Sequence, residues 1–90
     1  MEINNYSNYL IYRDGRVWSK FTNKFLKAGT NHGGYLHVGL YKDGVTKPCR
    51  IHRLVAENYI PNPENKGDVD HINRNPSDNR IDNLRWPSRS

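Results

Sequence analysis

The chain has 90 residues and a mass of 10.5 kDa, enough for one small domain and too little for the core of a large enzyme. Only 34% of the residues are hydrophobic, but two Trp, six Tyr and two Phe argue against a disordered tail. Cys49 is the single cysteine, which excludes an internal disulfide and a Cys-based zinc ribbon. No segment approaches the roughly 18 apolar residues of a membrane span, and the N-terminus lacks the features of a signal peptide. We therefore expect a soluble intracellular protein that does not act at a membrane.

The positive charge lies in the first half of the chain. Residues 1–50 hold eight Lys or Arg and three Asp or Glu, whereas residues 51–90 hold six of each, so the net charge of +5 belongs to the first half. A basic half rich in aromatic residues is typical of a surface that docks on a polyanion such as nucleic acid. On charge alone, a merely solvated basic surface explains the excess equally well.

Two β-hairpins are predicted in this first half. Residues 9–13 and 16–20 flank Asp14-Gly15, which we interpret as a two-residue turn because glycine accepts the positive φ of hairpin turns. Residues 35–42 alternate aliphatic and aromatic side chains and lead into Asp43-Gly44, a turn of the same kind. A further strand is predicted over residues 24–28, with a loop over 29–34. The first half is therefore predicted to be a small antiparallel sheet.

The pattern changes near residue 51. Residues 51–59 lack Gly and Pro and place their apolar side chains on one stripe, which predicts a short helix that Pro61 and Pro63 terminate. Between Asn58 and Asn83, 11 of 26 residues are Asn or Asp, whose side chains favour turns over regular elements. Such a polar stretch, held by a few apolar residues, is often a functional loop.

The dipeptide Asp70-His71 lies within this stretch and carries the clearest chemistry. A carboxylate can hold a hard divalent cation, and an imidazole with a reference pKa of about 6.5 can take a proton from water near neutral pH. Together they are the parts for metal-assisted hydrolysis of a phosphodiester. Alone, the dipeptide also fits an ordinary turn or surface pair. An EF-hand calcium loop is excluded, because the spacing of Asp68, Asp70 and Asn73 is wrong and the required Gly and Glu are missing.

Several further motifs occur along the chain in the order in which HNH endonucleases of the phage and intron homing type have them, and the chain resembles these nucleases. The resemblance covers about residues 51–88, and the β-rich first half resembles, more loosely, the module that precedes the motif in those nucleases. The matching residues are Ile51-His52-Arg53-Leu54-Val55-Ala56, Ile60-Pro61-Asn62-Pro63, Val69-Asp70-His71-Ile72 and Asn79-Arg80-Ile81-Asp82-Asn83-Leu84-Arg85-Trp86.

The resemblance implies an α+β fold, in which a small antiparallel β-sheet module is followed by a short helix and a ββα-metal hairpin. Residues 1–50 would form the DNA-docking module, and residues 51–90 the nuclease motif. In that motif His71 would be the general base, Asp70 a ligand of one divalent metal (Mg²⁺ or Mn²⁺), and Asn83 the residue that pins the loop and orients the histidine. A phage-infected or bacterial cytoplasm is then the expected location.

The chain departs from the family pattern at its C-terminus. In the family, a helix follows the Trp and brings a second metal ligand, Asn or His, about two turns along. Here Pro87-Ser88-Arg89-Ser90 follow Trp86, with Ser88 placed as the N-cap of such a helix. Three explanations stay open: the chain is truncated, a homodimer or partner supplies the ligand, or Asp70 and water hold the metal weakly. Arg74 also replaces a Gly common in relatives, which would alter the turn or add a phosphate contact.

The remaining candidates divide into structural and DNA-binding residues. His52 is expected to pack or hydrogen-bond near the helix start, Asn79 to bond loop backbone, and Trp18 and Trp86 to anchor the core. Basic residues that we expect to contact the phosphates of double-stranded DNA are Arg13, Arg16, Lys20, Lys24, Lys27, Lys42, Lys47, Arg74, Arg80 and Arg85.

Two functions of different class follow from these observations. The first is an HNH-type DNA endonuclease that uses a divalent metal and a His general base. The second is a nucleic-acid-binding fragment or remnant that keeps the fold without catalysis. A structural protein of a phage particle is a third, and its lack of DNA binding would distinguish it.

Overall fold

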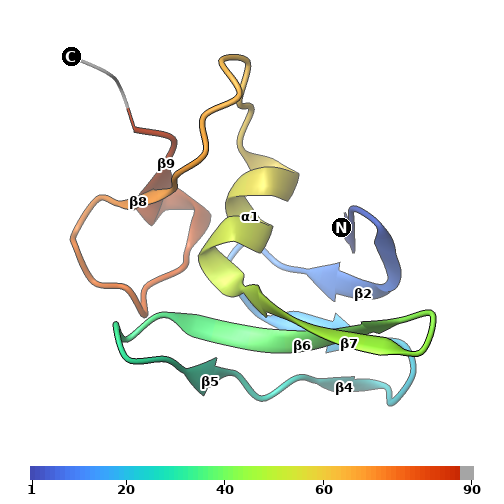
Figure 1. Cartoon of the computed structure of the whole chain (residues 1–90). Coiled ribbons are helices and arrows are strands. Elements are labelled where there is room, and N and C mark those ends of the chain that lie inside the picture. The colour runs from blue at the N-terminus through green and yellow to red at the C-terminus, as the bar shows by residue number, and fades with distance from the viewer. Residues whose placement is uncertain (88–90) are drawn as a thin grey trace.

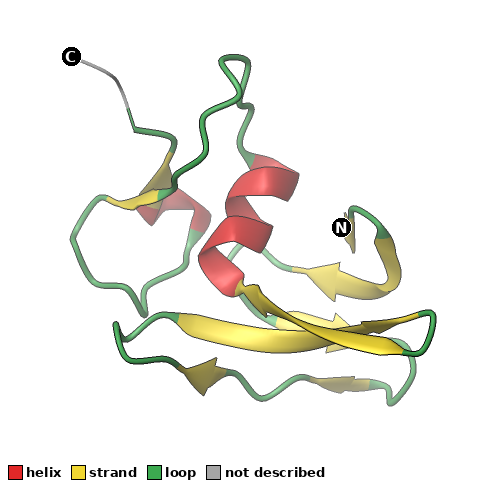
Figure 2. Ribbon diagram, in the orientation of Figure 1, coloured by secondary structure: helices red, strands yellow, loops and turns green. Residues whose placement is uncertain are grey.

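The structure is a computed structural model that describes residues 1–87. Ser88, expected as the N-cap of a further helix, lies outside the described residues. Across residues 1–87, one α-helix, a 3₁₀ turn and nine strands follow one another (Figures 1 and 2). In order they are β1 (Glu2–Ile3), β2 (Tyr6–Ile11), β3 (Val17–Ser19), β4 (Lys24–Phe25), β5 (Gly29–Thr30), β6 (Leu36–Lys42), β7 (Val45–Arg50), α1 (Ile51–Tyr59), β8 (Asp70–His71), η1 (Ile81–Asn83) and β9 (Leu84–Arg85).

The first sheet contains β1 to β4 in chain order, all antiparallel. Its hairpin between β2 and β3 differs from the prediction, because Ile11 pairs with Val17 and the turn therefore spans residues 12–16 rather than two residues. The Asp14 carboxylate accepts a hydrogen bond from the backbone N–H of Arg16 (3.1 Å), and the N–H of Gly15 donates to the carbonyl of Tyr12 (2.9 Å). A local bond from an Asp side chain thus replaces strand pairing at this point.

The second sheet contains β5, β6 and β7. Its turn is the predicted two-residue one: Lys42 pairs with Val45, and Asp43 and Gly44 both have positive φ (53° and 82°). Pro48 lies on β7, at the edge of the sheet, where its missing N–H costs least. The first half is therefore antiparallel as predicted, but it forms two sheets rather than one, and the expected loop over 29–34 contains β5.

The helix α1 has the predicted bounds. Its buried face joins a single hydrophobic core to which both halves of the chain contribute, with Ile11 and Leu40 from the sheets fully buried. The Tyr59 hydroxyl donates to the carbonyl of Ile11 (2.6 Å), which ties the end of the helix to the first sheet. Burial of apolar side chains from both halves therefore holds the helix against the sheets.

Beyond α1, strands β8 and β9 pair antiparallel, with His71 opposite Leu84. The loop over residues 72–83 connects them and, with the β8–β9 pair, lies on the opposite side of α1 from the N-terminus (Figure 1). The mixed architecture of antiparallel sheets and one helix confirms the predicted α+β class. Within residues 1–87, no helix is both long and apolar enough to cross a membrane.

Candidate active site

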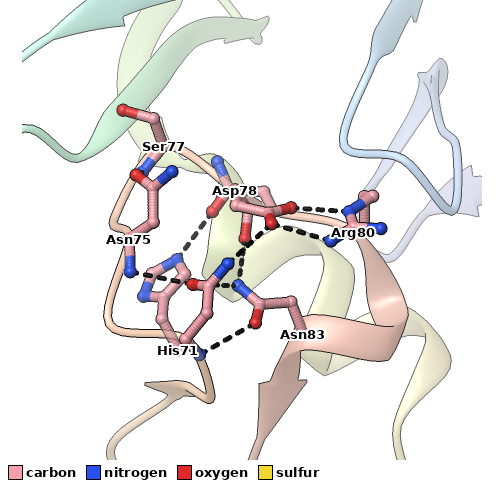
Figure 3. A network of polar contacts seen from close by, with 8 residues as sticks. His71, Asn75, Ser77, Asp78, Arg80 and Asn83 are labelled. Carbon is pink, nitrogen blue, oxygen red and sulfur yellow. Dashed lines mark hydrogen bonds and ion pairs between the residues drawn. The ribbon is translucent and has the colours of Figure 1, made fainter.

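Asn83 holds together the loop over residues 72–83. Its side-chain oxygen accepts from the N–H of Asn73 (3.0 Å), and its amide donates to the side-chain oxygen of Asn73 (2.9 Å) and the carbonyl of Asp78 (2.8 Å) (Figure 3). Its own carbonyl accepts from the N–H of Ile72 (2.8 Å). Because Asn83 is 5% exposed, these bonds are shielded from water and fix both arms of the loop.

Short polar turns complete the loop between these arms. The side chains of Asn73 and Asn75 accept from the backbone N–H two residues on (2.8 and 3.1 Å), a pattern typical of Asx turns. Asp78 receives two hydrogen bonds from the Arg80 guanidinium (2.8 and 2.9 Å), visible in Figure 3. These bonds lower the pKa of Asp78 to about 2, with a smaller contribution from Asn73, so Asp78 is a carboxylate at neutral pH.

His71 is buried at the start of this loop. Its Nε2 atom lies 2.8 Å from the side-chain oxygen of Asn79, which is itself 3% exposed. Asn79 was expected to bond loop backbone, and the structure instead gives it the His71 ring as its partner. Within residues 1–87 the hydrogen bonds of the Asn83 side chain go to Asn73 and Asp78, so any effect of Asn83 on His71 acts through the loop.

Two aromatic rings pack around His71. The centroid of the His52 ring lies 5.2 Å from that of His71, and Tyr35, just before β6, lies 5.9 Å from His71 and 5.2 Å from His52. Burial, with a smaller contribution from the neighbouring His71, lowers the pKa of His52 to about 4, so His52 is neutral near pH 7. Its Nδ1 atom is buried without a hydrogen-bond partner in the described chain. His52 therefore packs near the start of α1, beside the His71 ring.

Asp70 lies beside His71 on β8, with its side chain about half exposed. One of its oxygens accepts from the Arg85 guanidinium on the paired strand β9 (3.2 and 3.1 Å). A carboxylate is the oxygen ligand that Mg²⁺ prefers, and Mg²⁺ commonly uses one or two carboxylates with water. Residues 1–87 contain no group of three or more His, Cys, Asp or Glu side chains suited to a metal. Asp70 therefore fits as one ligand of a largely hydrated ion.

All ten predicted DNA-binding side chains are exposed. Four of them form ion pairs at the surface: Arg16 with Asp14, Lys20 with Glu2, Arg80 with Asp78 and Arg85 with Asp70. No ion pair is found within residues 1–87 for Arg13, Lys24, Lys27, Lys42, Lys47 and Arg74. Trp86, predicted to anchor the core, is partly buried and donates from its indole to the carbonyl of Ile60 (3.1 Å).

Comparison with known proteins points to the HNH endonucleases. A family model described as HNH endonuclease matches residues 49–90. The solved structure of I-HmuI, an HNH homing endonuclease that binds and cleaves DNA, superposes on 98% of this chain with a TM-score of 0.90 and 34% identity. Residues 49–90 carry the HNH endonuclease motif, and nearly the whole chain is similar to HNH endonucleases.

Curated HNH endonucleases are similar to most of this chain. Uncharacterized HNH endonuclease L245 of Acanthamoeba polyphaga mimivirus is 48% identical over 86 residues, which are 96% of this chain and 26% of the relative. H-N-H endonuclease F-TflII of Escherichia phage T5 is 36% identical over 88% of this chain and 42% of its own length. The chain spans 51% of the I-HmuI structure. It thus corresponds to about half or less of each relative.

The HNH motif pointed to Asp70, His71 and Asn83, but other residues of the site were missed. Tyr35 was placed only in a predicted strand, although its ring packs on His71, and Gly15 only in a turn, although it lies against Asn79. Both contacts arise through long-range packing. Asn73 and Asp78 form part of the loop network, and the only sequence signal for them was the general richness in Asn and Asp. Residues that hydrogen-bond across a loop leave no periodic pattern.

Proposed function

We propose that this chain hydrolyses phosphodiester bonds of double-stranded DNA. The observation that carries the proposal is the buried His71, whose Nε2 is bonded to Asn79 and whose neighbour on β8 is the partly exposed carboxylate of Asp70. One group suited to take a proton and one suited to hold a cation thus adjoin each other. The family match over residues 49–90 supports the same chemistry.

Each proposed role follows from the surroundings of the residue. His71 takes the proton of the attacking water, because within residues 1–87 its Nε2 is already bonded and Nδ1 is left as the acceptor. Asn83 keeps the loop closed, and Asp70 would bind Mg²⁺ or Mn²⁺ together with water. When bound, such an ion supplies stabilisation of the charge that develops on the scissile phosphate and the leaving oxygen.

The basic first half is proposed to dock on the DNA backbone. Six of its exposed Lys and Arg side chains form no ion pair within residues 1–87 and are available to phosphates: Arg13, Lys24, Lys27, Lys42, Lys47 and Arg50. Contacts of this kind release counterions, so log affinity falls with log salt at a slope of about −0.9 per phosphate neutralised. Residues 1–50 would thus hold the duplex while residues 51–90 carry the chemistry.

Nicking of supercoiled plasmid tests the proposed activity. The 90-residue chain should nick the plasmid in the presence of Mg²⁺ or Mn²⁺, and EDTA should abolish this nicking. His71→Ala should lower the nicking rate by about 10²- to 10⁴-fold, the usual contribution of a general base. His32→Ala is the matched control, since it removes an exposed imidazole from a loop outside the site. Nicking by His71→Ala at the wild-type rate would refute the role of His71.

A second candidate, DNA binding without cleavage, has one observation in its favour. Residues 1–87 offer Asp70 but no cluster of three metal-binding side chains, so the ion would depend on water or on a partner for its other ligands. This candidate predicts salt-dependent DNA binding together with no nicking at any metal concentration. If a homodimer completes the metal site, nicking should appear when the protein concentration is raised. If no homodimer does so, nicking should stay absent.

A further inference from the structure

The contact with Asn79 determines which of the two His71 ring nitrogens carries the proton. A side-chain amide oxygen accepts hydrogen bonds and cannot donate, so the contact of 2.8 Å between this oxygen and Nε2 requires a proton on Nε2. In the neutral ring the lone pair then lies on Nδ1. Because both residues are more than nine-tenths buried, water competes little for this bond.

The first hairpin holds Asn79 in its place. The N–H of Ile81 donates to the carbonyl of Arg13 (2.8 Å), which joins the end of the loop to the turn over residues 12–16. At Gly15, where φ is +93°, an added Cβ would lie 3.1 Å from the Cβ of Asn79 and 3.4 Å from its carbonyl oxygen. The backbone of the turn therefore packs directly against Asn79, at a distance that glycine permits.

The orientation of the His71 ring is limited independently of Asn79. The His52 and Tyr35 rings lie 5.2 and 5.9 Å from it, centroid to centroid, and come from α1 and from the segment before β6. Packing thus fixes where the ring lies, while the amide oxygen of Asn79 selects which nitrogen carries the proton. The two contributions can be separated by experiment.

We propose that Asn79 is a positioning residue for His71, which it holds as the Nε2-protonated tautomer so that Nδ1 faces the reaction as a base. This inference rests on the proposed function only for its effect on the rate. The tautomer itself is a property of the free chain and exists whether or not the chain cleaves DNA. Neighbouring groups that orient a catalytic or metal-binding histidine typically contribute about 10- to 100-fold.

The direct test is NMR of the ¹⁵N-labelled chain without metal or DNA. Long-range ¹H–¹⁵N correlations distinguish the two neutral tautomers, and His71 of the wild type should be protonated on Nε2. An amide turned the other way would present its NH₂ group to the ring and require the proton on Nδ1, and that spectrum would overturn the proposal. The wild-type measurement does not depend on whether any variant folds.

Variants then connect the tautomer to the rate. Asn79→Ala should give a mixture of tautomers and lower kcat by about 10- to 100-fold with KM unchanged. Asn79→Asp keeps an acceptor oxygen and should restore the Nε2 tautomer. Asn8→Ala removes an exposed amide from β2, away from the loop, and is the matched control for both readouts.

The outcomes separate this inference from the proposed function. A wild-type chain that shows the Nε2 tautomer but never nicks DNA would refute the proposed function. It would not affect the inference that Asn79 sets the tautomer of the His71 ring. A chain that nicks through His71, with both tautomer and kcat unchanged in Asn79→Ala, would refute the positioning role and leave the function standing.

Discussion

The β6–β7 hairpin and the loop over residues 72–83 are held together by different kinds of bond. In the hairpin, six residue pairs from His37–Arg50 to Lys42–Val45 form a regular backbone ladder, and side chains mainly cover it. In the loop, the side chains of Asn73, Asn75 and Asn83 supply hydrogen bonds that a ladder would otherwise provide. The hairpin therefore tolerates many side chains, whereas the loop requires particular ones.

This difference has a functional consequence. His71 lies on the β8–β9 ladder, and a ladder presents alternate side chains to two faces without supplying a polar partner for the ring. The loop supplies that partner, because its other amides satisfy the backbone of the loop while Asn79 remains available for His71. The cost is that stability of the loop depends on a few buried polar groups, each of which is expensive to leave without a partner.

The largest effect is expected from Asn83→Ala. The substitution removes three partly buried side-chain hydrogen bonds and leaves the N–H of Asn73 and the carbonyl of Asp78 without that partner. We expect the free energy of unfolding to fall by about 2 to 3 kcal/mol. Urea denaturation measures this loss, and hydrogen exchange should rise in residues 72–83 more than in β6 and β7.

Asn8→Ala provides the control for that loss. Asn8 is an exposed amide on β2, where the backbone carbonyl, not the side chain, accepts from Lys20 (2.8 Å). Its removal should change stability by less than about 0.5 kcal/mol. Equal losses in the two variants would show that buried amides do not hold the loop.

The next effect concerns pH and the His52 ring beneath the loop. Burial lowers the pKa of His52 to about 4, from 6.5 in the unfolded chain, so below pH 6.5 the unfolded state binds more protons and stability falls as the pH falls. By pH 5 the loss from His52 should be about 1 to 2 kcal/mol, and it should level off below pH 4.

The His52→Phe variant isolates this contribution, since Phe packs in the same place and does not titrate. Carboxylates also titrate at low pH, so the quantity to compare is the difference in unfolding free energy between wild type and variant at each pH. That difference should change between pH 6.5 and 4. A difference that is constant over this range would contradict the assignment.

Sequence patterns predicted the elements whose stability comes from local signals. Asp43-Gly44 correctly predicted a two-residue turn, and the apolar stripe with its following prolines predicted α1 from Ile51 to Tyr59. The turn at residues 12–16 was predicted with the wrong length, because the bond from Asp14 to Arg16 competes with pairing in a way that the same Asp-Gly dipeptide does not reveal. Two sheets rather than one reflect long-range packing.

For the candidate site, side-chain chemistry singled out Asp70 and His71, and the resemblance to HNH nucleases added Asn83 and the expected role of each residue. The sequence did not predict which residues contact these side chains in the folded chain. Asn79 and Gly15 are separated by more than sixty residues, and their contact arises only when the hairpin packs on the loop. Such contacts are specified by the folded core rather than by any spacing along the chain.

The smallest effect compares a turn in each region. Gly44 in the β6–β7 turn has φ +82°, whereas Arg74 in the loop has φ +63° without the benefit of glycine. A left-handed conformation costs a residue with a Cβ about 1 to 2 kcal/mol, and the greater freedom of glycine in the unfolded chain cancels part of that cost. Arg74→Gly should therefore stabilise the chain by up to about 1 kcal/mol in urea denaturation.

Arg74→Ala separates the strain from the charge at this position. It keeps the Cβ and removes the guanidinium, so stability should stay near the wild-type value. If Arg74 contacts a phosphate, both variants should reduce the slope of log affinity against log salt by about 0.9. Stabilisation by Arg74→Gly with an unchanged slope would mean that the loop tolerates strain here without a gain in DNA binding. A reduced slope would mean that Arg74 contacts a DNA phosphate, and that the loop, unlike the hairpin turn, keeps a strained residue because of this contact.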